Sequence, residues 1–265
     1  MQNLYFDYYM QVAYSEPVEK CYYTIKCIPK ETDRQHIESL SVEIEPKDTQ
    51  MQGEDSFGNG YYYGCVEQEH REFHFHIQGK VRTGLSQWES LQEENRIGMF
   101  RYPSGLTMPG QKLMEYFTEL AMEQTASAIE KASYIMHRLH QDFVYEKNIT
   151  DIHTSAEEAW ELGKGVCQDY AHIMLVLCRL AGIPARYVAG MMLGEGYSHA
   201  WVEILAGDRW YAFDPTNDKE VDASYIKIGT GRDAYDCMIN RGVMIGGGTQ
   251  SQIISVKVWM EETRE

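Results

Sequence analysis

Apolar and polar residues alternate over the first hundred positions of the chain, with the two-residue period of half-buried β-strands. The alternation is clearest at residues 23–27, 40–45 and 73–77. Asn59 and Gly60 form a turn signal before three consecutive tyrosines, because both residues tolerate positive φ. The pattern predicts an antiparallel β domain over residues 1–105. The prolines and glycines of residues 103–110 predict a link to a second unit.

After this link the apolar positions recur at helical spacing. They predict an amphipathic helix over residues 119–141. A capping-box pattern that begins at Ser155 predicts a short helix ending at Gly163. A third helix is predicted to end before Gly182, with Cys167 in its first turn.

Strand-like segments follow the helices at residues 185–192, 199–205 and 210–213. Residues 206–209 predict a hairpin between the last two segments. A glycine-rich loop and one more alternating strand around residues 254–258 form the tail, which we assign to the second unit. Together these elements predict an α+β protein whose second domain covers residues 106–265.

Composition narrows the class of protein. The 265 residues are 43% apolar and 12% aromatic, which is enough to bury a sizeable core and excludes general disorder. The longest apolar run, around residues 173–178, is far shorter than the ~20 residues that span a bilayer, and the first residues lack the pattern of a secretory signal. A net charge of −16 repels phosphate backbones and anionic lipid, so we expect no nucleic-acid and no membrane partner. A cytoplasmic location is the expectation.

The six cysteines include no CxxC pair, which predicts reduced thiols instead of disulfides or a zinc ribbon. A helix N-terminus carries partial positive charge that favours the thiolate, so Cys167 is the candidate nucleophile. A thiolate nucleophile needs an imidazole to handle the proton and a third group to orient that imidazole. His199 and Asp214 are the candidates for these two roles.

The predicted hairpin brings His199 and Asp214 together. If it turns symmetrically about Gly207 and Asp208, Trp201 pairs with Asp214. Asp214 is then the same-face diagonal neighbour of His199, within side-chain reach. A loop with an odd number of residues would place the two side chains on opposite faces of the sheet.

Other polar residues receive a structural interpretation. His74 and His76 share a strand face, but spacing fixes no third ligand, and the sequence has no D-x-D-x-D-G calcium loop. We therefore expect no metal and no cofactor. Asp169 follows Cys167 by two residues and fits either a role at the site or a favourable interaction with the helix dipole. His172 is expected to point away from the thiol, as a packing or surface residue.

Four ordered segments resemble the transglutaminase-like superfamily: residues 165–172 (GVCQDYAH), 182–190 (GIPARYVAG), 198–203 (SHAWVE) and 210–217 (WYAFDPTN). The β-rich front resembles the N-terminal domain that often precedes this core in bacterial members. Residues 231–236 also resemble a segment found after the core in that group, although Cys237 and the two residues after it replace the usual Val and Pro.

The resemblance implies a papain-like core with the chain order Cys, His, Asp. Cys167 would attack an amide carbonyl, His199 would shuttle the proton, and Asp214 would hold the ring. The backbone N–H of Cys167 should be one oxyanion donor; the second donor stays open, with Trp160 and Gln168 merely nearby in sequence.

The predicted function is cleavage of a peptide or related amide bond through a thioester acyl-enzyme. Hydrolysis leads because water is always available, and protein-glutamine transglutamination is the alternative within the same class. A non-catalytic peptide- or glycan-binding module is the alternative of another class. The expected partner is a peptide or protein substrate, and the tyrosines at 61–63 offer a contact surface on the front domain.

Overall fold

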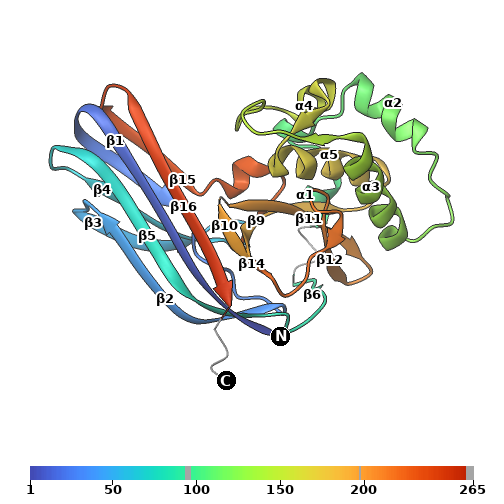
Figure 1. Cartoon of the computed structure of the whole chain (residues 1–265), viewed down its shortest axis with the longest axis horizontal. Helices are drawn as coiled ribbons and strands as arrows, with labels where there is room; N and C mark the ends of the chain where they lie inside the picture. The colour runs from blue at the N-terminus through green and yellow to red at the C-terminus, as the bar shows by residue number, and fades with distance from the viewer. Residues whose placement is uncertain (93–96, 197, 261–265) are drawn as a thin grey trace.

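The structure is a computed structural model that describes residues 1–92, 97–196 and 198–260. Its N-terminal part is an antiparallel sheet (Figure 1). The strands that the first 90 residues contribute to it are β1 (Gln2–Ile25), β2 (Gln35–Glu45), β3 (Thr49–Glu54), β4 (Gly60–Val66) and β5 (His70–Thr83). The predicted antiparallel β-rich front is therefore present.

The long strand β1 organises this sheet, because it is paired along both edges. Its first half pairs with β5 on one side and with β16 (Gln250–Met260) on the other. Its second half pairs with β4 and with β15 (Asn240–Gly246). Every second side chain of the first half is buried, as the two-residue period requires: Leu4, Phe6, Tyr8, Met10 and Val12.

The second part of the chain packs helices against another antiparallel sheet. The helices are α1 (Ile97–Arg101), α2 (Gln111–Glu119), α3 (Ala128–Asp142), α4 (Ala156–Leu162) and α5 (Cys167–Leu180), with short 3-10 turns η2 (Gly105–Thr107) and η3 (Ala234–Cys237). The sheet has the order β13-β12-β11-β9-β14, and β6 pairs with β12. Its strands are β6 (Glu89–Ser90), β9 (Ala185–Met192), β11 (His199–Ala206), β12 (Arg209–Asp214), β13 (Lys219–Glu220) and β14 (Tyr225–Gly231). The short pair β7 (Val144–Tyr145) and β8 (Lys164–Gly165) lies beside α4 and α5.

Helices α4 and α5 begin at the residues predicted from their capping and N-terminal signals. Ser155 caps α4 by accepting a hydrogen bond from the backbone N–H of Glu158, and Gly163 ends it with φ 69°. Helix α5 begins at Cys167, as predicted. In the described part of the chain, no helix has the length and apolar character needed to cross a bilayer.

The helix predicted over residues 119–141 is wrong at its start. Helix α2 ends at Glu119, Ala121 has a φ of 43°, and α3 begins only at Ala128. The reason is a second capping box. The Ser127 hydroxyl accepts from the Glu130 N–H at 3.3 Å, and the Glu130 carboxylate accepts from the Ser127 N–H at 2.8 Å.

The assignment of the tail to the second unit is also wrong, because β15 and β16 both pair with β1 of the N-terminal sheet (Figure 1). Val256 lies opposite Tyr8 and Val258 lies opposite Phe6, and both valines are buried with them. The strands β2 to β5 leave one edge of β1 open, and the tail supplies both the missing backbone hydrogen bonds and the apolar cover.

The two parts of the chain also share one hydrophobic cluster. Met191 of β9 and Ile226 and Ile228 of β14 are buried in the same cluster as Phe6 and Tyr8. Strand β10 (Gly194–Gly196) extends the connection, because it pairs with β16 in the N-terminal sheet. The N-terminal sheet is thus packed firmly against the part that carries Cys167.

Replacing Val256 by Asp tests the role of the tail strand. An unpaired carboxyl group would take the place of a side chain that is 5% exposed. We expect the free energy of unfolding to fall by about 4 kcal/mol, measured by urea denaturation. The neighbouring exposed Ser255 is the control, since Ser255→Asp should cost less than about 1 kcal/mol. Equal losses in the two variants would contradict the pairing.

Candidate active site

Cys167 is positioned by the backbone that enters α5. The Asp169 carboxylate accepts hydrogen bonds from the Val166 N–H at 2.7 Å and from the Thr150 hydroxyl at 2.6 Å, which fixes the residue just before the nucleophile. A Cβ at Gly165 would lie 2.4 Å from that carboxylate, so glycine is required by close approach. Cys167 itself is half-buried, and as the first helical residue it has a backbone N–H with no intrahelical acceptor.

From the sequence, Asp169 fitted either a role at the site or a favourable interaction with the helix dipole. The structure places its carboxylate in the first turn of α5, where both are open. Its side chain is 1% exposed, and burial raises its pKa above the ordinary value. One of its oxygens, Oδ1, has no hydrogen-bond partner among the described residues. The side chain acts on the site through the backbone of Val166.

His199 and Asp214 meet across the hairpin formed by β11 and β12. The register pairs Val202 with Phe213 and Ala206 with Arg209, which is the predicted symmetric turn. His199 Nε2 lies 2.7 Å from Asp214 Oδ2. The sequence-based prediction that these two side chains share a face is therefore confirmed.

Asp214 is fully buried and surrounded by donors. Besides His199, its Oδ2 accepts from the Tyr225 hydroxyl at 2.7 Å and from the Asn217 side-chain amide at 2.7 Å. Its Oδ1 accepts from the backbone N–H of Thr216 at 3.0 Å. Burial alone would raise the pKa of Asp214, but the hydrogen bonds, above all that of His199, lower it below its ordinary value.

The electrostatics of His199 favour the imidazolium. Burial acts to lower the pKa of His199, but hydrogen bonds with Asp214 and Cys167 outweigh it and raise the pKa to about 10. Because Nε2 is engaged by Asp214, Nδ1 is the ring nitrogen left for the thiol. The structure thus brings together all three residues that the sequence predicts.

Cys167 and His199 open into a cavity of about 600 Å³. Gln168 and Tyr187 line it on the core side, and a second cysteine, Cys237, lies in the same lining. Burial raises the pKa of Cys237 above its ordinary value. The opposite side of the cavity is formed by residues of the N-terminal sheet.

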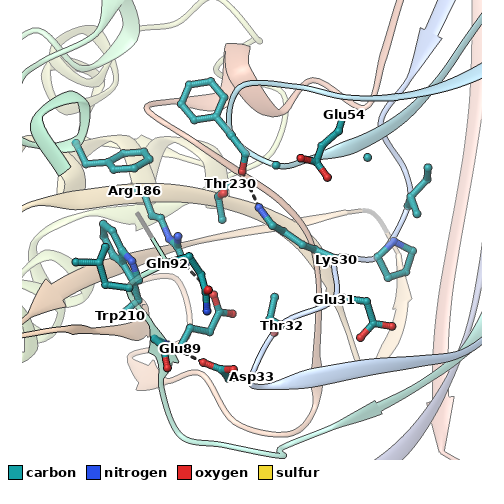
Figure 2. Close-up of a pocket in the computed structure, with 18 of the residues that line it drawn as sticks. Lys30, Glu31, Thr32, Asp33, Glu54, Glu89, Gln92, Arg186, Trp210 and Thr230 are labelled. Atoms are coloured by element: carbon teal, nitrogen blue, oxygen red, sulfur yellow. Dashed lines mark hydrogen bonds and ion pairs between the residues drawn. The ribbon is translucent and has the colours of Figure 1, made fainter. Parts of the chain in front are cut away.

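A second cavity, of about 740 Å³, lies between the β1–β2 connection and the sheet of the second part, and it holds none of the three residues (Figure 2). Glu89 lines it and bonds to Arg186 at 2.8 Å and to Lys227 at 2.5 Å. Glu203 bonds to the same two cations, which closes a buried alternating network. Burial, together with Lys227 and Arg186, lowers the pKa of Lys30 at this cavity to about 8.

The other sequence candidates lie away from the thiol or have other partners. Trp160 packs against Tyr116, with ring centroids 4.1 Å apart. His172 is fully buried and accepts from the Ala234 N–H, consistent with packing. His76 bonds to Asp7 at 2.7 Å. Within residues 1–92, 97–196 and 198–260, no group of three or more His, Cys, Asp or Glu side chains is arranged to hold a metal ion.

Sequence reasoning missed the residues that complete the site. Asn217 lies three residues after Asp214 in one of the four matched segments, so its position was a usable signal. Tyr225 comes from β14, and nothing in the sequence pairs that strand with Asp214. Tyr8 and Met10 come from the opposite end of the chain, and nothing in the sequence places them at the site.

Cys167 at the N-terminus of α5 thus lines the same cavity as His199, which Asp214 holds on the antiparallel sheet. Comparison with known proteins shows the family. Residues 112–215 match the transglutaminase-like superfamily, and residues 7–82 match the bacterial transglutaminase-like N-terminal region. The chain belongs to the transglutaminase-like superfamily.

Two proteins are similar to this chain in sequence, and one solved structure is similar to it in fold. It is 38% identical to an uncharacterised protein of Mycobacterium leprae over 124 residues, which span 43% of this chain and 44% of that protein. An uncharacterised protein of Mycobacterium bovis is 26% identical over 94% of this chain and 89% of its own length. The crystal structure of a candidate cysteine protease from Cytophaga hutchinsonii superposes with a TM-score of 0.82 at 20% identity, over 100% of this chain and 92% of that one. This last likeness shows the fold.

The raised pKa of His199 is directly measurable by NMR titration of the imidazole. We expect Asp214→Asn to lower the pKa of His199 from about 10 toward the ordinary value of 6.5. Asp218→Asn, which removes the exposed partner of His137, is the matched control and should leave His199 unchanged. An unchanged pKa in Asp214→Asn would contradict the assigned electrostatics.

The same shift has a consequence for stability. Because the pKa of His199 is higher in the folded state than the ordinary 6.5, its proton stabilises the fold fully below pH 6.5. This contribution is lost as the pH rises through about 10.

Proposed function

We propose that this protein is a thiol-dependent acyl-transfer enzyme that hydrolyses a peptide or related amide bond. One observation carries the proposal: a half-buried cysteine at a helix N-terminus lines the same cavity as an imidazole that a buried carboxylate holds. This arrangement favours the thiolate and a protonated His199 at neutral pH, the two states from which amide cleavage begins.

The proposed reaction has two halves. The Cys167 thiolate attacks the carbonyl carbon, and the oxyanion that forms is stabilised by the backbone N–H of Cys167. His199 then gives its proton to the leaving amine, which departs and leaves a thioester on the sulfur. In the second half, His199 takes a proton from water, the hydroxide attacks the thioester, and the carboxylic acid and the thiolate are released.

Gln168 is the side chain we propose as the second oxyanion donor. It follows Cys167 directly, lines the same cavity, and donates from Nε2 to the Asp151 carbonyl over 3.3 Å, a long contact that is easily exchanged. Trp160, the other residue considered from the sequence, is packed against Tyr116 and Phe143 instead.

Hydrolysis remains ahead of protein-glutamine transglutamination, because water needs no dedicated acceptor site. The Cytophaga hutchinsonii protein with the same fold is a candidate cysteine protease, which favours hydrolysis over amine transfer for that protein. The binding-module alternative is disfavoured, since a site that only binds has no need for a buried carboxylate with three further donors behind the histidine. The cytoplasmic location stays a prediction.

Alkylation by iodoacetamide, resolved by peptide mass spectrometry, tests the nucleophile. We expect Cys167 to react at pH 6, and its rate to fall about 100-fold in His199→Ala because the imidazole that assists the thiol is lost. Cys237 is an internal control, because it lines the same cavity and its pKa is raised by burial. It should stay unreacted at that pH in both proteins.

Two outcomes would count against the proposal. If Cys167 reacts only as an ordinary thiol, with the same rate in His199→Ala, the site does not generate a nucleophile and the binding alternative takes over. If an acylated Cys167 is released by a primary amine in preference to water, measured from product masses, transglutamination replaces hydrolysis.

A further inference from the structure

The N-terminal sheet faces the candidate nucleophile across the catalytic cavity. Five of its residues line the cavity that holds Cys167 and His199, and we name them the recognition wall: Tyr8, Met10, Asn240, Gln252 and Ile254. They come from β1, from the start of β15 and from β16. Figure 1 shows these strands lying beside the part of the chain that contains α5. The cavity is therefore built by both halves of the protein.

The recognition wall is held in place relative to the histidine. Tyr8 lines the same cavity as Ser198, the residue just before His199, and is buried in one hydrophobic cluster with Met191 of β9. Tyr8 is 2% exposed, and its ring stacks on Phe75 with centroids 5.7 Å apart. The wall is thus a fixed surface whose position is tied to the reacting groups.

Two side-chain amides of the recognition wall are poorly satisfied. Asn240 Nδ2 lies 3.1 Å from the sulfur of Met10, and Gln252 Nε2 lies 2.8 Å from the same sulfur. A thioether is a weak acceptor, and two donors share it here. Each amide can gain by turning its N–H to a peptide carbonyl, and its oxygen can accept from a peptide N–H.

The charge of the cavity limits what can enter. Apart from Cys167 and His199, Lys147 is the one residue with a formally charged side chain among the described residues that line the cavity. In the whole chain 24% of the residues are charged. A basic substrate side chain would lose its hydration here without a carboxylate partner, which is costly. An acidic one would meet Lys147 alone, in a protein whose net charge of −16 repels it.

We propose that the recognition wall selects the substrate: an uncharged peptide segment whose backbone amides bind Asn240 and Gln252 while the scissile carbonyl meets Cys167. This inference rests on the proposed function of Cys167, and it assigns the N-terminal sheet a direct role in specificity. Met10 acts as a placeholder acceptor that the peptide displaces.

The test compares two kinds of alkylating probe on Cys167. Three pools of acetylated tripeptidyl chloromethyl ketones, one neutral, one acidic and one basic, are reacted with the full chain, and iodoacetamide is the reference without a peptide. The measured quantity is the ratio of the peptidyl rate to the iodoacetamide rate. We expect the neutral pool to give a ratio at least about tenfold above the charged pools.

Variants then locate the selectivity. Replacing both Asn240 and Gln252 by Ala should lower the neutral ratio about tenfold, because two hydrogen bonds to the peptide are lost. Gln250→Ala is the matched control: Gln250 lies on the same strand, its amide approaches Met244 sulfur at 4.0 Å, and it is outside the cavity. Its ratio should not change. Gln252→Glu should shift the preference toward the basic pool.

Three results would overturn the proposal: an unchanged neutral ratio in the double variant, an equal fall in Gln250→Ala, or a preference of the unaltered protein for a charged pool. Failure of the proposed function is separately visible, because it lowers the iodoacetamide rate and its dependence on His199. The ratio stays measurable in that case, since chloromethyl ketones also alkylate an unactivated thiol.

Discussion

The buried carboxylate of Asp214 is the constraint on which the site depends. A carboxylate without exposed surface stays ionised only where donors replace its lost hydration. His199, Asn217 and Tyr225 supply them, together with a backbone N–H. Because these donors come from β11, from the turn after β12 and from β14, the antiparallel sheet must keep its register for the anion to be tolerated. The anion in turn keeps His199 charged and oriented toward Cys167.

A second constraint joins the two halves of the chain. Strand β1 requires partners along both edges, and the tail returns across the molecule to provide them. The same return places Asn240 and Gln252 in the catalytic cavity. The N-terminal sheet is therefore part of the site, and Gln35 at the start of β2 fixes it to the second sheet through hydrogen bonds with the backbone N–H and C=O of Lys227. Folding and substrate recognition rest on the same pairing.

Local signals allowed much of this to be predicted from the sequence. The start of α5 at Cys167 and both ends of α4 follow from capping residues, which act over three or four positions. The His199–Asp214 contact follows from a symmetric hairpin, again a local feature. The false start of the helix before α3 came from apolar spacing that outweighed the Ser127 capping signal.

Contacts between residues far apart in the chain could not be predicted from the sequence. The pairing of β16 with β1 joins residues about 250 positions apart, and an alternating strand carries no mark of its partner. Tyr225 and Tyr8 were missed for the same reason, since each reaches the site through a strand that pairs only in the folded chain. Short motifs predicted the three residues with chemistry, Cys167, His199 and Asp214. They did not predict the residues from distant strands that contact the site.

The dependence of Cys167 on the buried carboxylate is the central claim, and the alkylation rate of Cys167 at one fixed neutral pH measures it most directly. The rate should be compared between the unaltered protein and Asp214→Ala, with Asp218→Asn as the control. A clear fall of the rate in Asp214→Ala alone is the predicted result, because that carboxylate holds the His199 ring at the cavity that contains the thiol. Equal rates in the unaltered protein and Asp214→Ala would contradict it.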